Sequence, residues 1–193
     1  MRFLVLYAHP NPKSFSAALH RTVVETLARS GHEVDDCDLY AEGFDPVLSY
    51  EERMRYLDVP ENRRPVEESV RRLEAADGLV LVYPVWNFGP PAILKGYLDR
   101  VFLPGVSFTL VDGLAPPNLR HLTVLVAVTT YGAPRWRAFL LGDPPRKLVT
   151  RVLGVMVAPR ARRHYLALHD MNRKSPDARA RFVRKVERTL ARL

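Results

Sequence analysis

The chain has 193 residues, of which 47% are hydrophobic and 26% charged, which indicates one globular domain and excludes a disordered or fibrous protein. Its single cysteine, Cys37, excludes an internal disulfide framework, and neither a signal peptide nor a run of roughly 18 apolar residues is visible, so we expect a cytoplasmic protein.

The net charge of +8 is carried by residues 160–193, which hold 11 Lys or Arg and 3 Asp or Glu residues. Such a basic end could meet a nucleic acid, an anionic membrane or a phosphorylated ligand, although a solvated face of the last helix is the simpler interpretation. No recognised base-reading motif accompanies it, so we expect no nucleic-acid partner.

Apolar runs typical of strands alternate with helical patterns along the chain. Strands are predicted at residues 2–8, 33–39, 78–83, 122–130 and 163–169. Helices are predicted from apolar residues spaced three or four apart at 15–27, 66–73, 93–102, 148–155 and 182–193. Strict alternation of this kind predicts an α/β fold with a doubly wound, five-stranded parallel sheet covered by helices on both faces. We therefore expect a single domain over residues 1–193.

Five connections between the predicted elements are either unusually long or unusual in composition. The long connections at 40–62 and 104–120 are expected to serve recognition or assembly rather than packing. The loops at 9–14, 84–90 and 131–142 leave the carboxyl ends of predicted strands, where open parallel sheets bind their ligands.

The first of these loops leads into a helix with the sequence His-Pro-Asn-Pro-Lys-Ser-Phe-Ser, residues 9–16. Small hydroxyl residues at the start of a helix can offer side-chain and backbone donors to a phosphate, with help from the helix dipole. An ordinary Ser N-cap explains the same fragment equally well. The Gly-rich signatures of P-loop nucleotidases and of Rossmann dinucleotide sites are both absent, which disfavours those two classes.

The second and third loops are rich in aromatic residues, prolines and glycines. The second reads Pro-Val-Trp-Asn-Phe-Gly-Pro-Pro over residues 84–91, and the third reads Thr-Thr-Tyr-Gly-Ala-Pro-Arg-Trp over residues 129–136. Prolines favour an extended, rigid backbone whose free N–H and C=O groups can contact the edge of a flat heterocycle. The three loops together therefore suit a ligand with a phosphate at one end and a planar ring at the other.

Several segments resemble the flavodoxin-like NAD(P)H:quinone oxidoreductases, a family that includes DT-diaphorase, the modulator of drug activity B and the ancillary reductases of potassium efflux systems. The segments are LYAHPNPKSF at 6–15, DLYAEGFDPVL at 38–48, LEAAD at 73–77, YPVWNFGPPAILKGYLDRVF at 83–102 and the Thr pair at 129–130. The resemblance extends from the first predicted strand to the fourth.

The resemblance implies a flavin site built from the same three loops. The phosphate end would be held by His9, Ser14, Phe15 and Ser16. The isoalloxazine ring would lie against Val85, Trp86, Asn87 and Phe88, with its other edge closed by Thr129, Thr130, Tyr131 and Gly132. FMN is favoured over FAD because no adenine pocket is evident, and no metal site is expected.

Two departures from the family pattern affect the proposed roles. Ser16 stands where many members have Asn, and Tyr131-Gly132 replaces a Gly-Gly pair. Members of the diaphorase type use a Tyr and a His for charge relay after that pair, but no histidine lies between Gly132 and Arg163, so that role is not transferred. Tyr131 is the only catalytic candidate.

The activity implied is NAD(P)H dehydrogenation with quinones or similar small acceptors, by a two-electron, ping-pong transfer through the flavin. The family also implies a homodimer. Two alternatives remain open: a flavoprotein regulatory subunit of a potassium efflux system, with a peripheral membrane-protein partner, and a non-enzymatic flavodoxin-like electron carrier.

Overall fold

A computed structural model describes residues 1–193 and contains one five-stranded sheet. The strands are β1 (Arg2–Tyr7), β2 (Glu33–Asp38), β3 (Gly78–Val85), β4 (Val124–Tyr131) and β5 (Arg162–Leu168). All neighbours pair in parallel, in the order β2-β1-β3-β4-β5. The expected α/β class and doubly wound parallel sheet are confirmed.

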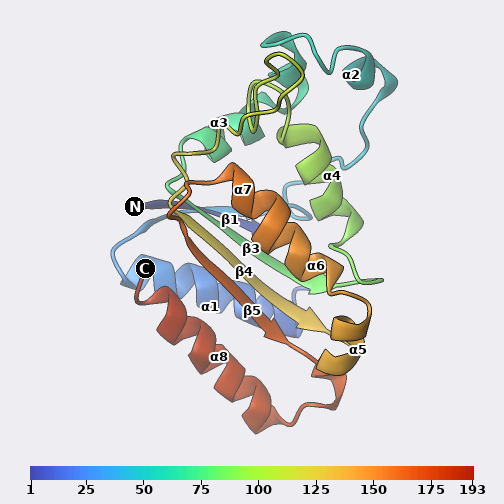
Figure 1. Cartoon of the computed structure of the whole chain (residues 1–193). Helices are drawn as coiled ribbons and strands as arrows, with labels where there is room; N and C mark the ends of the chain where they lie inside the picture. The colour runs from blue at the N-terminus through green and yellow to red at the C-terminus, as the bar shows by residue number, and fades with distance from the viewer.

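Helices cover both faces of the sheet (Figure 1). The longer ones are α1 (Phe15–Arg29), α3 (Glu67–Glu74), α4 (Ala92–Val101) and α8 (Pro176–Leu190). A composite helix consists of α6 (Pro144–Lys147), the π-helical η2 (Leu148–Leu153) and α7 (Gly154–Met156). The short elements are α2 (Tyr50–Met54), η1 (Glu61–Val66), α5 (Arg135–Leu140) and η3 (Met171–Arg173). None of the helices combines the length and the apolar character that a bilayer span needs.

Two apolar cores follow from the alternation of side chains along the buried strands. On one face α1 and α8 pack on residues such as Val5, Val82 and Val126. On the other face α3, α4 and the composite helix pack on residues such as Leu6, Leu81 and Leu125. Since β1, β3 and β4 are buried on both faces, their central residues are apolar without alternation, as in Phe3–Leu6, Leu79–Val82 and Val124–Val128.

The structure corrects three details of the sequence prediction. Four short helices interrupt the expected strict alternation, and α5 lies inside the segment expected to be a loop. The composite helix buries Val149 and Leu153, whereas Val152 and Val155, which were expected on its apolar stripe, are 48% and 63% exposed. The π-helical turns have a longer period than an α-helix, which moves the buried stripe by one position.

The 40–62 connection is fastened to α4 by a buried arginine. Arg100 donates from Nε and Nη2 to Glu52 Oε1, at 2.9 and 2.6 Å, and from Nη1 to the carbonyl oxygen of Asp45. The two charged side chains are only 10% and 12% exposed. The ion pair therefore holds the 40–62 connection against the C-terminal end of α4.

Candidate functional site

The three predicted loops meet at one end of the sheet because parallel strands end on the same edge. The first loop follows β1 and the second follows β3, which is its neighbour in the sheet. The chain leaves β1 toward β2 on one side and later returns to β3 on the other, so the strand order reverses here, as it does where such sheets bind ligands. Pro84 and Val85 lie beside Thr130 and Tyr131 in the register of β3 with β4, which brings the second and third loops together.

Free backbone donors occur at the start of α1. Ser14 caps the helix, and its side-chain oxygen accepts the amide of Ala17 at 3.0 Å. The amides of Phe15 and Ser16 precede the first intrahelical bond and donate to no group of the protein. No acidic residue stands in the first turn to balance the positive end of the helix dipole. These amides and the hydroxyl groups of the two serines therefore suit a phosphate group.

The second loop is a tight turn rather than the extended segment that its prolines suggested. Trp86 and Gly89 exchange both backbone hydrogen bonds, at 3.0 and 2.8 Å. Asn87 and Phe88 between them adopt left-handed conformations with φ of 48° and 54°. A positive φ is uncommon for a bulky side chain such as Phe88 and costs free energy, a feature that often marks functional loops. The turn leaves the amides of Asn87 and Phe88 without an acceptor in the protein.

The first two loops also touch through their rings. His9 and Trp86 meet edge to face with ring centroids 5.7 Å apart. His9 Nδ1 accepts the amide of Asn11 at 3.0 Å, and burial lowers the pKa of its imidazole. Because Nδ1 is the acceptor, a neutral His9 carries its hydrogen on Nε2 and can act there as a donor. Trp86 is 41% exposed, which leaves its indole ring open to a planar ligand.

Two threonines at the end of β4, just before the third loop, have buried side chains. Thr129 and Thr130 are buried, and Thr129 Oγ1 has no hydrogen-bond partner in the protein. A buried polar atom without a partner is unfavourable unless a ligand or water satisfies it. Gly132, just beyond, is exposed.

Tyr131, the candidate catalytic residue, lies in a buried cluster. Its side chain is 1% exposed, and its hydroxyl group donates to Asp143 Oδ1 at 2.7 Å and lies 2.5 Å from the hydroxyl of Tyr165. Burial raises the pKa of Tyr131, so the phenol stays protonated at neutral pH. His169 stacks on the Tyr131 ring at 4.4 Å between centroids. The cluster positions the backbone of the third loop.

Sequence reasoning missed Asp143, Tyr165 and His169. The search for a histidine stopped before the fifth strand, yet β5 pairs with β4 in a register that brings Leu168 beside Thr130, so the next residue, His169, lies beside Tyr131. A histidine directly after the carboxyl end of the neighbouring strand was the available signal.

The arrangement fits a flavin. It offers unpaired amides for a phosphate at α1 and an exposed indole with unpaired amides at the second loop, and the unpaired Thr129 hydroxyl lies buried behind the third loop. These three features come from strands β1, β3 and β4, which are adjacent in the sheet.

A sequence-family model described as a flavodoxin-like fold matches residues 1–191. The chain belongs to the flavodoxin-like fold family. Within it, the solved structure of Smu.1420 from Streptococcus mutans UA159 is 30% identical, with a TM-score of 0.87 and full coverage of both chains. The NAD(P)H:quinone oxidoreductase from Methanothermobacter marburgensis is 26% identical, with a TM-score of 0.83 over 99% of this chain and 98% of that one.

The curated relatives are longer. NAD(P)H dehydrogenase (quinone) 1 of Cavia porcellus is 33% identical over an alignment of 148 positions that covers 68% of this chain and 54% of that protein. The chain thus spans about half the length of this flavodoxin-like relative. The individual flavin contacts and the homodimer stay predictions, although Leu110, Val111 and Leu114 in the 104–120 connection are about half exposed or more, as an assembly surface would require.

Proposed function

We propose that this flavodoxin-like protein is a flavin-dependent NAD(P)H dehydrogenase that reduces quinones or similar small acceptors, with FMN as the flavin and FAD as the alternative. The proposal rests mainly on two neighbouring groups of unpaired atoms. The amides at the start of α1 have no partner, and the second loop beside them has an exposed indole and two further unpaired amides. Similarity to proteins named as NAD(P)H:quinone oxidoreductases supports the choice of substrates.

Each loop has a distinct task in this proposal. The amides of Phe15 and Ser16, with the hydroxyl of Ser14, hold the flavin phosphate. Trp86 and Phe88 support the ring, and the Asn87 amide donates to its edge. The bound flavin supplies the redox chemistry by accepting two electrons from NAD(P)H and passing them to the acceptor.

The buried cluster behind the third loop has a positioning role. Asp143 occupies a left-handed conformation with φ of 46°, held by the hydrogen bond from Tyr131. The cluster holds the end of β4 and the start of the third loop in place. The backbone at Tyr131 and Gly132 would then hold the edge of the ring on which negative charge accumulates on reduction. We propose no proton transfer by the phenol of Tyr131, because its hydroxyl group is already engaged with Asp143 and Tyr165.

Steady-state kinetics with NAD(P)H and a small quinone test the proposal. Because both substrates must approach the same ring face, the first product leaves before the acceptor binds. Double-reciprocal plots are therefore expected to be parallel at several fixed quinone concentrations.

Two results would contradict this shared-face mechanism. Converging lines would show that NAD(P)H and quinone occupy separate places. A flavin-loaded sample that accepts electrons from chemical reductants but never from NADH or NADPH would instead indicate an electron carrier.

A further inference from the structure

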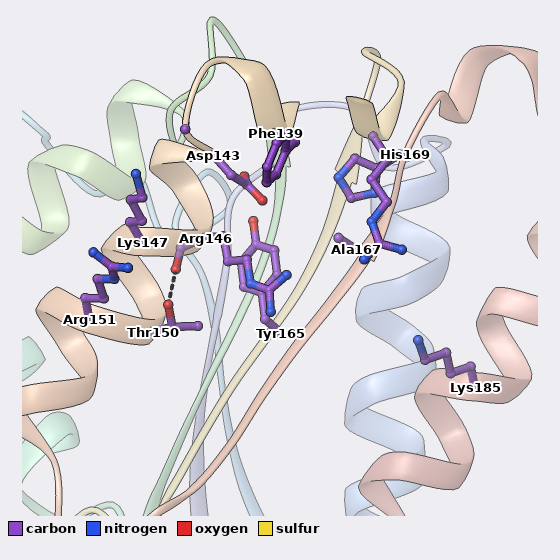
Figure 2. Close-up of a pocket in the computed structure, with 12 residues that line it drawn as sticks. Phe139, Asp143, Arg146, Lys147, Thr150, Arg151, Tyr165, Ala167, His169 and Lys185 are labelled. Carbon is purple, nitrogen blue, oxygen red and sulfur yellow. Dashed lines mark hydrogen bonds between the residues drawn. The ribbon is translucent and has the colours of Figure 1, made fainter. Parts of the chain in front are cut away.

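A hollow lies beside β5, at the outer edge of the sheet. It has a volume of about 580 Å³ and lies between the α6–η2 segment and α8. Five of its lining residues are cationic: Arg135, Arg146, Lys147, Arg151 and Lys185. Figure 2 shows Lys147 and Arg151 on one side, Lys185 of α8 on the other, and Tyr165 between them. We call the space enclosed by these residues the β5-edge pocket.

The positive charge of the β5-edge pocket is not neutralised within the protein. None of its five cations forms an ion pair, and every ion pair of the chain lies between residues 2 and 100. Asp143 is the only acidic residue in the lining, and its Oδ1 atom already accepts from Tyr131. Cations gathered in a concave surface raise the local concentration of anions.

The remaining lining can bind an organic group. Phe139 is 84% exposed, which leaves its ring free to stack on a planar ligand. Thr150 donates its hydroxyl hydrogen to the carbonyl oxygen of Arg146 and keeps its oxygen as an acceptor. His169 Nε2 is buried and has no partner. The volume is in the range of small-molecule sites.

We infer that the β5-edge pocket binds a nucleotide with two or more phosphate groups, its phosphates among the five cations and its base against Phe139. A recessed site with cations on opposite walls fits a small polyanion better than a flat bilayer or a duplex. The phosphates could belong to the phosphorylated adenosine end of NADPH or to a separate nucleotide. The first source, NADPH, rests on the proposed function. The pocket adjoins the third loop of the proposed flavin site, because Tyr165 in its lining contacts Tyr131.

Calorimetric titration with 2′,5′-ADP, ADP and pyrophosphate tests the inference on the full chain, with and without FMN. We expect binding that weakens as salt is added. The double variant Arg146→Ala/Arg151→Ala should bind about tenfold more weakly or worse, since each removes charge-assisted hydrogen bonds. The matched control is Arg181→Ala/Arg184→Ala, which removes two exposed arginines of α8 outside the pocket and should bind as the parent does.

Kinetics then separate the two sources of the phosphates. A KM that rises for NADPH and not for NADH in the pocket variant assigns the site to NADPH. Unchanged KM values together with weakened titration assign it to a separate nucleotide. The inference is overturned if no probe binds, if both double variants bind equally, or if the protein binds anionic lipid vesicles and no nucleotide. Because the titration is run without FMN as well, its outcome is independent of whether the flavin proposal holds.

Discussion

Replacing Ser16 by Asp is expected to abolish flavin binding while leaving the domain folded. Ser16 is 4% exposed in the first turn of α1, next to the unpaired amides proposed to hold the phosphate. A carboxylate there repels the phosphate, and at about 5 Å in a partly buried site the cost is about 3 kcal/mol, equivalent to at least 100-fold in Kd. Fluorescence titration with FMN measures the change.

The matched control is Ser16→Asn, which has nearly the same shape as Asp and carries no charge. We expect Ser16→Asn to bind FMN within about tenfold of the parent, since only one neutral hydrogen bond is altered. An acidic residue in the first turn of a helix is favourable in itself, which offsets part of the cost of placing a carboxylate at a position that is only 4% exposed. Thermal unfolding of the flavin-free Ser16→Asp and Ser16→Asn variants measures the stability that remains and should show that both are folded. If Asp and Asn bind FMN equally, the phosphate does not lie at α1.

Replacing Arg100 by Ala is expected to lower the free energy of unfolding by about 3–5 kcal/mol, because it leaves the carboxylate of Glu52 without its partner in a nearly buried position. The control is Lys95→Ala on the same helix. Lys95 pairs with Asp99, but the two side chains are 54% and 48% exposed, so its loss should cost about 1 kcal/mol or less. Urea unfolding of both variants makes the comparison.

The same ion pair predicts a dependence on pH. Although burial alone would raise the pKa of Glu52, hydrogen bonds from the Ser49 amide and from Arg100 bring it below its ordinary value of 4.5. A carboxylate with a lowered pKa stabilises the folded state above its unfolded pKa, and this contribution is lost as the pH falls through the folded value. The difference between the parent and Arg100→Ala should therefore shrink below about pH 4.5. Equal stability of the two proteins at pH 7 would contradict the assigned role of Arg100.

The sheet and its long helices were predictable because each carries its own apolar pattern. Buried strands such as Leu125–Val128 are apolar without interruption, and α1 repeats its apolar residues every four positions. The short helix α5 was missed because Trp136, Phe139 and Leu140 are all exposed, so its apolar residues do not mark a buried face. The exposed Val152 and Val155 were misassigned because a π-helix cannot be distinguished from an α-helix in the sequence.

The site was predictable where it follows directly from a strand end. The three loops could be placed together once β1, β3 and β4 were recognised as parallel neighbours. In the cluster around Tyr131 only His169 had a signal in the sequence, because it directly follows a predicted strand. The contacts of Tyr131 with Tyr165 and Asp143 depend on the packing of β5 against β4 and on the left-handed turn that carries Asp143. The burial of Tyr131 could not be predicted either, since an aromatic residue at a strand end can point into the ligand site or into the protein.

If the three loops hold a flavin that NAD(P)H reduces, the visible spectrum of the protein must change with each substrate. The full chain is loaded with FMN, freed of excess, and mixed with NADH or NADPH without oxygen. We predict one FMN per chain, loss of the oxidised flavin band on adding NAD(P)H, and its return on adding a quinone. Folded protein that binds neither FMN nor FAD, or a bound flavin that stays oxidised with both NADH and NADPH, would contradict the account.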